Sequence, residues 1–239
     1  MKRIQFEEGG IYHIFNRGVE KRLIYLHDND RWRFLQALFL FNDEKSSVNS
    51  LWELERSGKG LNFRIIKDFF EKNKLSRRPL VRLMADCLMP NHYHLMAQEI
   101  KPGGISKFMQ KIGTGYAMYF NKKYDRVGGL FQGSFRALHI EENDHLKYLL
   151  VYINVLNPGQ LIEPNLKEQG VVDIKKVLNF AKSFLWSTNR EYLDLRQSII
   201  IDKGILGEIF QTGDQYKRFL EAILPLRAKF ESAKHLFLE

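Results

Sequence analysis

The sequence predicts a protein of the α+β class, in which an antiparallel β-sheet carries helices on one face and is followed by a helical C-terminal extension. Four segments have the alternating apolar pattern of strands, and segments with helical spacing of apolar residues separate them. After Pro158 only helical patterns recur. With 239 residues, 44% of them hydrophobic, the chain is long enough to bury a full core.

The first predicted strand covers residues 11–15 and ends at the turn-like sequence Asn16-Arg17-Gly18. A helix is predicted over residues 28–41, because Asp28 or Asp30 can cap it and apolar residues recur at helical spacing. Residues 44–79 are expected to be an insertion that contains a helix over residues 63–72.

Two further strands are predicted over residues 81–89 and 92–98, joined by the turn Pro90-Asn91. A helix over residues 106–124 leads to a fourth strand over residues 134–140. A final helix, capped by Asn143 or Asp144, then runs toward Pro158. This β-α-β-β-α-β-α order is that of a ferredoxin-like or RRM-like sheet, in which the strand that begins at His92 is central.

The charge of the chain is unevenly distributed between two predicted units, residues 1–160 and a helical C-terminal extension over residues 161–239. The extension, with helices expected over residues 175–184 and 215–224, holds 12 basic and 11 acidic residues, whereas the first unit holds 25 basic and 17 acidic residues. A basic surplus indicates a polyanionic partner, most commonly nucleic acid, although a solvated basic face without function has the same composition.

Cys87 is the only cysteine, so the chain forms no internal disulfide and a reducing compartment is expected. The N-terminus lacks the apolar run of a signal peptide, and no run of 18 apolar residues is present to span a membrane. We therefore expect a soluble protein of the cytoplasm that does not bind membranes.

The most informative motif is His92-Tyr93-His94. A strand sends alternate side chains to one face, so both histidines are expected on the same face, where two imidazoles can bind one metal ion. The alternative is a half-buried strand with two structural histidines.

The final predicted helix, which contains Tyr148 and Tyr152 and runs toward Pro158, is expected to lie across the same face of the sheet. Tyrosine is a poor nucleophile at neutral pH, and a cation is needed to stabilise the phenolate during attack on a phosphodiester. Two imidazoles and a polar side chain from this helix would hold Mg²⁺ or Mn²⁺ with positions left open for phosphate oxygens. Alternatively, Tyr148 and Tyr152 are packing aromatics on one helical stripe.

Four blocks of sequence in the same order resemble the single-tyrosine HUH transposases of small insertion sequences, especially the REP-associated tyrosine transposases. HUH denotes histidine, bulky hydrophobic residue, histidine. The blocks are residues 10–18, 89–95, 119–133 and 144–158.

The resemblance implies a metal-dependent endonuclease and strand transferase that acts on single-stranded DNA, often folded as a hairpin. By position, His92 and His94 match the metal-binding pair of the family, and Tyr152 matches its nucleophile. Attack by Tyr152 would leave a 5′-phosphotyrosine link and a free 3′-hydroxyl, which needs no ATP and no phosphate-binding glycine loop. The resemblance also implies a nucleoid-associated protein that acts as a monomer or a homodimer.

The chain departs from the family pattern in the tyrosine helix. The family usually places a polar metal ligand four residues after the nucleophile, and this chain has Leu156 there. Asn157 is one residue late, about 100° further round an ideal helix, so it can bind the metal only if the helix is bulged or ends before it. Asn154 is a less suitable substitute. Ser134 and Gln160 replace basic residues that relatives often carry.

Six basic residues near the matched blocks are candidates for phosphate contact: Arg17, Arg22, Lys122, Lys123, Arg126 and Arg136. Tyr116 and Tyr119 precede three of them and are expected to stack on DNA bases. A plain amphipathic helix explains this segment nearly as well. The four-residue spacing of Tyr148 and Tyr152 also raises the hypothesis of two nucleophiles, as in replication initiators with paired tyrosines.

Two competing functions remain from the sequence. One is a non-catalytic single-stranded nucleic-acid-binding protein derived from a transposase, which the displaced Asn157 makes credible. The other is a metal-dependent phosphohydrolase of small molecules, which fits the histidines but not the basic surplus.

Overall fold

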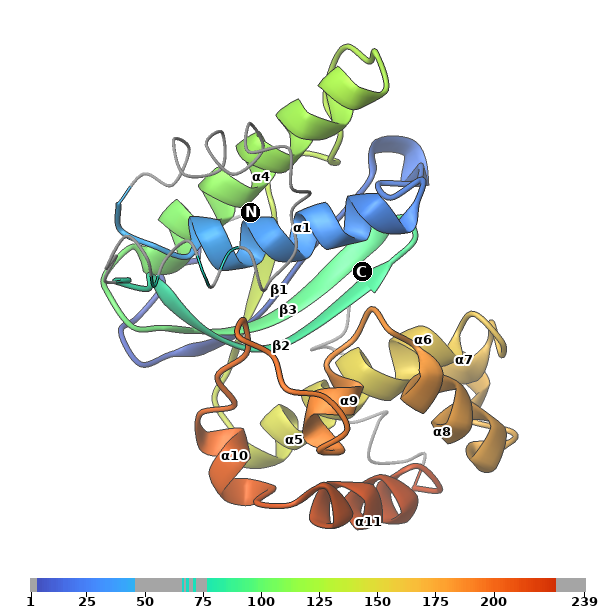
Figure 1. The fold of residues 1–239 in the computed structure, drawn as a ribbon. Coiled ribbons are helices and arrows are strands. Elements are labelled where there is room, and N and C mark those ends of the chain that lie inside the picture. Colours follow the sequence, from blue (N-terminus) through green and yellow to red (C-terminus); the bar gives the residue numbers. More distant parts are fainter. Residues whose placement is uncertain (1–3, 46–65, 67, 69–70, 72–76, 227–239) are drawn as a thin grey trace.

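The protein is built on a four-stranded antiparallel sheet of order β2-β3-β1-β4 (Figure 1). The computed structural model describes residues 4–45, 66, 68, 71 and 77–226. The strands are β1 (Ile11–Arg17), β2 (Val81–Met89), β3 (His92–Glu99) and β4 (Arg136–Ile140). The ferredoxin-like α+β fold is thereby confirmed, and the strand that begins at His92 is central, as predicted.

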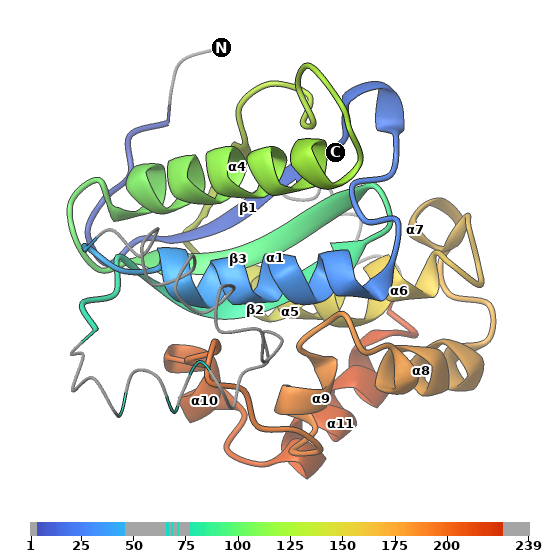
Figure 2. The ribbon, with the colours of Figure 1, turned by 45° about the horizontal axis from the view of Figure 1, so that its top comes forward.

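One face of the sheet is covered by α1 (Asp28–Phe41) and α4 (Gly104–Lys123), as Figures 1 and 2 show. The helix α1 begins where predicted because the Asp30 carboxylate accepts hydrogen bonds from the backbone N–H groups of Leu26 (2.9 Å) and His27 (3.0 Å). Gly115 lets the two helices pack closely, since a Cβ at this position would collide with the Phe41 ring.

The opposite face of the sheet is covered by the helix that follows β4 and by the C-terminal helices (Figure 1). The chain continues from α5 (Asn143–Val151) through a π-helical turn, η2 (Tyr152–Leu156), into α6 (Asn157–Gly159). The remaining helices are α7 (Leu166–Gln169), α8 (Ile174–Ser183), α9 (Asn189–Tyr192), α10 (Ile205–Ile209) and α11 (Gly213–Ile223).

The C-terminal extension shares a core with the sheet. The segment after α8 runs along the edge of β2, where the Leu88 N–H donates to the Trp186 carbonyl (2.8 Å) and the Asp202 N–H to the Leu83 carbonyl (2.9 Å). On this side of the sheet, a hydrophobic cluster joins side chains of β2 and β3 to α5, η2, α8 and α11. The predicted division into units 1–160 and 161–239 stays a prediction.

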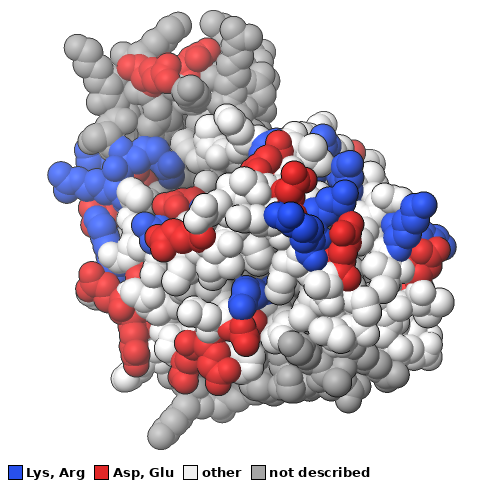
Figure 3. All heavy atoms as spheres, turned by 90° about the horizontal axis from the view of Figure 1, so that it is seen from below, with Lys and Arg blue, Asp and Glu red and all other residues white. Residues whose placement is uncertain are grey.

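The face formed by the C-terminal helices carries mixed charge. Viewed from that side, Lys and Arg side chains are interspersed with Asp and Glu (Figure 3). The basic surplus of the chain does not gather there, which agrees with the near-neutral composition of residues 161–239.

Most predicted elements form within a few residues of their expected bounds. The helix predicted over residues 28–41 and the strand over residues 81–89 have those bounds, whereas β1 and α4 extend beyond theirs. The helix expected over residues 63–72 lies, for the most part, outside the described residues. Of the described helices, none is long and apolar enough to cross a membrane.

Candidate active site

The strand register places the two motif histidines on the face of the sheet that η2 covers. In the ladder between β1 and β3, Phe15 is opposite His94 and Arg17 is opposite His92. Since directly opposite residues of an antiparallel pair share a face, these four side chains project the same way. His13 lies two residues before Phe15 on β1 and therefore joins them.

Each motif histidine has its Nδ1 atom engaged in a hydrogen bond. His94 Nδ1 lies 2.9 Å from His13 Nε2, with both side chains fully buried, and His92 Nδ1 lies 2.7 Å from Asn91 Oδ1. A metal-binding histidine almost always uses its second ring nitrogen in this way, which fixes the tautomer. The Nε2 atoms are therefore the ones suited to bind a metal. No sequence pattern indicates that His13 supports the pair, because the contact depends on strand register.

The candidate nucleophile lies beside these histidines. Tyr152 is 1% exposed, and its ring is edge-on to His94 and His13, with centroids 5.4 and 5.8 Å away. Tyr148, one turn earlier, is also buried, in the core that α5 forms with the sheet. Tyr152 thus has ring contacts with both buried histidines, and it is also the position that the sequence resemblance matches to a nucleophile. The hypothesis of a second nucleophile at Tyr148 stays a prediction.

The tyrosine helix has a bulge between Tyr152 and Asn157. A bulge there is the condition for Asn157 to act as a metal ligand. The Asn157 backbone N–H donates to the Tyr152 carbonyl, five residues earlier, and this bond closes the π-helical turn η2. A π turn brings residue i+5 to about the position that residue i+4 takes in an α-helix. The structural condition for Asn157 to act as a metal ligand is therefore met, although its role as a ligand stays a prediction.

The residues at this position fit a divalent metal ion. Asn157 is fully buried, its Oδ1 accepts a hydrogen bond from Gln160 Nε2 (3.1 Å), and its Nδ2 has no hydrogen-bond partner among the described residues. A buried amide end without a partner is rare, and rotating the amide would present its oxygen there instead. Within the described part of the chain, no three His, Cys, Asp or Glu side chains gather as a metal site. A bound ion would therefore need the Asn157 amide or phosphate oxygens beside the two imidazoles.

A pocket of about 200 Å³ opens on the histidine pair. It is lined by Phe15, Asn16, Arg17, Lys21, Asn91, His92, His94, Gln132 and Arg136. Three of these residues are permanent cations, and the exposed Arg136 side chain faces the pocket from β4. The pocket therefore combines candidate metal ligands with positive charge, which suits a phosphate group.

Residues 65–155, which include β2, β3, α4 and β4, match the sequence model of the family described as IS200-like transposases. The match covers less than half of the chain, which is therefore similar to this family over that region. A solved structure described as a REP-associated tyrosine transposase bound to a REP hairpin has 14% sequence identity and a TM-score of 0.46, and the match covers 84% of this chain and 93% of that one. No curated protein sequence matches the chain.

The predicted phosphate-binding residues separate into two groups in the structure. Arg17 and Arg136 line the pocket, and the Arg17 Nε donates to Gln132 Oε1. Arg22 lies close by in sequence, on the surface, paired with Glu20 (2.5 Å). Lys21, the third cation of the pocket, is not among the predicted contacts, because its position depends on the turn after β1.

The second group, Lys122, Lys123 and Arg126, lies at the end of α4 and just beyond it, in the helical layer on the other face of the sheet. Lys123 binds the buried Asp30 carboxylate at 2.6 Å, although 32% of the lysine side chain is exposed. Burial opposes ionisation of Asp30, but hydrogen bonds from Lys123 and Tyr124 lower its pKa to about 2. Lys123 therefore anchors α4 to α1. The Arg126 guanidinium lies over the Phe120 ring, 5.6 Å from its centroid.

The expectation that Tyr116 stacks on DNA is wrong. Its side chain is 1% exposed, and its hydroxyl donates to the Ile24 carbonyl (2.7 Å). Tyr119 is half-buried, and its hydroxyl donates to Asp30 (2.9 Å). Both tyrosines were placed by their proximity to basic residues in sequence, whereas the spacing of Tyr116 from Ile112 and Phe120 is that of the buried stripe of α4.

Lys167, from α7, also reaches the tyrosine, and nothing in the sequence indicated it. Its Nζ donates to the Tyr152 hydroxyl at 2.8 Å and lies 4.3 Å from the centroid of the Tyr152 ring. The residue is fifteen positions away from Tyr152, beyond the end of the tyrosine helix, so no helical spacing relates the two.

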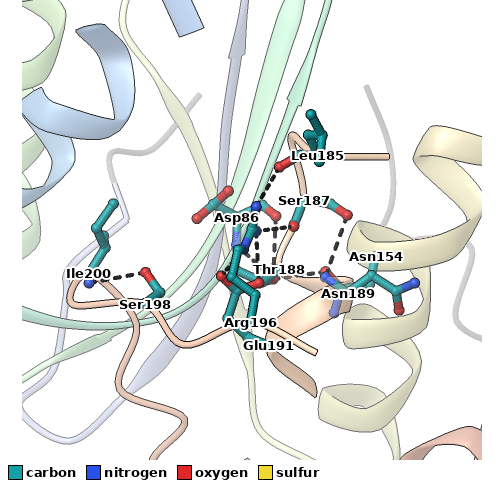
Figure 4. A network of polar contacts seen from close by, with 10 residues as sticks. All are labelled: Asp86, Asn154, Leu185, Ser187, Thr188, Asn189, Glu191, Arg196, Ser198 and Ile200. Carbon is teal, nitrogen blue, oxygen red and sulfur yellow. Dashed lines mark hydrogen bonds and ion pairs between the residues drawn. The ribbon is translucent and has the colours of Figure 1, made fainter. Parts of the chain in front are cut away.

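A buried polar network holds the bulged turn against the C-terminal segment (Figure 4). Asn154, inside η2, is fully buried, and its Oδ1 accepts a hydrogen bond from the Thr188 hydroxyl (2.8 Å). The Thr188 N–H in turn donates to the Asp86 carbonyl on β2 (3.1 Å). Arg196 closes the network, since it binds Glu191 and donates to the Ser187 carbonyl (2.8 Å). The Asn154 side-chain oxygen is thus used in a structural hydrogen bond, which disfavours it as a metal ligand.

Proposed function

We propose that this protein is a metal-dependent endonuclease and strand transferase that acts on single-stranded DNA, with Tyr152 as its nucleophile. The observation that carries the proposal is the contact of Tyr152 with the buried end of the histidine pair, beside a pocket lined by three cations. The similarity of residues 65–155 to IS200-like transposases agrees with a DNA substrate, and we expect that substrate to be a folded hairpin.

Each residue of the site has a chemical role in this proposal. His92 and His94 would hold Mg²⁺ or Mn²⁺ through Nε2, with the Asn157 amide as the third protein ligand. When bound, the ion would polarise a phosphoryl oxygen as a Lewis acid. Arg17, Lys21 and Arg136 would bind and orient the phosphate that enters the pocket.

The reaction is a transesterification at phosphorus. The Tyr152 oxygen attacks the scissile phosphate, a bond between that oxygen and phosphorus forms, and the bond to the 3′ oxygen of the preceding nucleotide breaks. The product is a 5′-phosphotyrosine link with a free 3′-hydroxyl. A second 3′-hydroxyl can reverse the reaction and join a new strand, because the link conserves the energy of the broken bond.

The test is a denaturing gel of the purified protein after incubation with Mn²⁺ and labelled single-stranded hairpins from the flanks of its own gene. We expect a slowly migrating protein–DNA band that requires the metal and is absent for Tyr152→Phe. Tyr148→Phe is the matched control on the same helix and should form the adduct as the unmodified protein does. Loss of the adduct in Tyr148→Phe alone would instead assign the attack to Tyr148.

A second candidate function is favoured by the burial of the nucleophile. Tyr152 is 1% exposed, so a phosphate reaches its hydroxyl only after neighbouring groups move. A non-catalytic protein that binds single-stranded nucleic acid would use the cationic pocket without that movement. It would bind hairpins with the same affinity with or without metal and never form an adduct, and the gel above, run beside a filter-binding assay, separates the two functions.

A further inference from the structure

The C-terminal extension supplies a charged group to the candidate nucleophile. Lys167 Nζ donates to the Tyr152 hydroxyl at 2.8 Å and also lies over the tyrosine ring. The neighbouring Leu166 is 3% exposed and packs in the core shared with the sheet, so the start of α7 is anchored. The lysine is therefore held at the oxygen atom that would attack the phosphate.

We propose that Lys167 is a catalytic residue that stabilises negative charge on the Tyr152 oxygen during both cleavage and joining of the strand. This inference rests on the proposed function, and it adds a residue outside the region that matches the transposase family. It also gives the C-terminal extension a part in the reaction, in addition to packing.

The chemistry requires such a group in both directions. In cleavage, the Tyr152 oxygen forms its bond to phosphorus while the bond to the 3′ oxygen breaks; the hydroxyl proton passes to water, and the departing 3′ oxygen takes a proton from water. In joining, a 3′-hydroxyl oxygen attacks phosphorus and its proton passes to water, while the tyrosine oxygen leaves as a phenolate that water then protonates. Lys167 keeps its protons throughout and holds the charged oxygen by a charge-assisted hydrogen bond.

Lys167 is better placed for this role than the histidines that also face Tyr152. The rings of His13 and His94 meet the tyrosine ring edge-on, and their facing nitrogens are 2.9 Å from each other. Lys167 donates a hydrogen bond to the Tyr152 hydroxyl itself. A cation at this oxygen stabilises the charged state more than the neutral one, which is the requirement for lowering a barrier.

The experiment compares Lys167→Ala with the unmodified protein in rates of adduct formation and of strand joining. We expect both rates to fall by about 10- to 100-fold, the factor that a hydrogen bond to a charged group typically contributes, while hairpin affinity and melting temperature stay unchanged. Lys147→Ala is the matched control, because Lys147 lies on α5 in an ion pair with Asp144 and should be dispensable.

Chemical rescue separates a catalytic role from a structural one. Propylammonium, which can occupy the space of the removed side chain and donate an N–H, should restore at least part of the lost rate in Lys167→Ala. Tetramethylammonium at the same concentration, which has no N–H to donate, should not, and neither cation should restore Tyr152→Phe. Lys167→Arg should retain more activity than Lys167→Ala.

The outcomes are distinct. An unchanged rate in Lys167→Ala, or a reduced rate that propylammonium does not restore, would overturn the inference about Lys167 and leave the proposed function intact. Absence of any adduct in the unmodified protein would overturn the proposed function itself, and the inference with it.

Discussion

The two faces of the sheet contrast in how their side chains are used. On the face toward α1 and α4, Tyr12, Ile14, Tyr93 and Leu95 pack among apolar and aromatic groups. On the opposite face, alternate residues of the same strands include a hydrogen-bonded pair of buried histidines next to a tyrosine and a lysine. Burying polar groups is costly unless they are paired, so such a cluster indicates a selected function, whereas the apolar face secures the fold.

The largest expected effect is a difference in stability between substitutions at two adjacent residues of β3 whose side chains lie on opposite faces. Tyr93 is 1% exposed and its ring lies 5.0 Å from that of Phe34, so Tyr93→Ala should lower the free energy of unfolding by about 3–5 kcal/mol. His92→Ala, one residue earlier on the opposite face, should change it by less than about 1 kcal/mol and yet abolish adduct formation. Denaturant titration beside the adduct gel checks both. Equal losses of stability would remove the distinction between the faces.

The next largest effect concerns the ion pair of Asp30 with Lys123 between α1 and α4, and it is tested by varying the pH. The pKa of Asp30 is about 2 in the folded protein, below the value of about 4 expected when unfolded, so its carboxylate stabilises the fold above pH 4. That contribution is lost as the pH falls from about 4 to about 2. Asp30→Asn should therefore cost about 1.5–3 kcal/mol at pH 7 and lack this part of the acid transition.

The matched substitution for that test is Asn at Asp28, whose side chain is exposed at the first turn of the same helix. Thermal melts between pH 2 and 7 should show a normal acid transition for Asp28→Asn. If Asp30→Asn has the same acid dependence as the unmodified protein, the contact with Lys123 does not stabilise the fold, and Lys123 becomes available for DNA.

The smallest of the three effects concerns the histidine face. His13→Phe keeps an aromatic ring on β1 but removes the nitrogen that lies 2.9 Å from His94 Nδ1. We expect Mn²⁺ affinity, measured by titration calorimetry, to fall about 10- to 100-fold, as for the loss of other groups that orient a metal ligand. Unchanged affinity with an intact fold would show that His13 is a packing residue only.

The sequence was sufficient where local pattern decides the structure. The limits of α1 follow from the Asp30 cap and from helical spacing, and the pair His92 and His94 follows from strand alternation. The need for a bulge before Asn157 could also be recognised, because its distance from Tyr152 conflicts with an α-helix. Lys21, His13 and Lys167 could not be found, since each reaches the site through a turn, a register or a chain reversal. Tyr116 was misplaced because nearby positive charge was weighted above its position on a buried stripe.

The π-helical turn η2 changes the directions in which the residues after it project from the helix axis. One extra residue within a helical turn rotates all later positions by about 100° relative to an uninterrupted α-helix. Gly159 comes just after this rotation, and a Cβ there would lie 2.7 Å from Leu166 and 3.1 Å from Val177, so the chain packs tightly where it turns toward α7. The single inserted residue thus changes the direction in which Asn157 projects and the direction of the chain segment that carries Lys167. A change in helix length at this point would therefore alter the positions of Asn157 and Lys167 together.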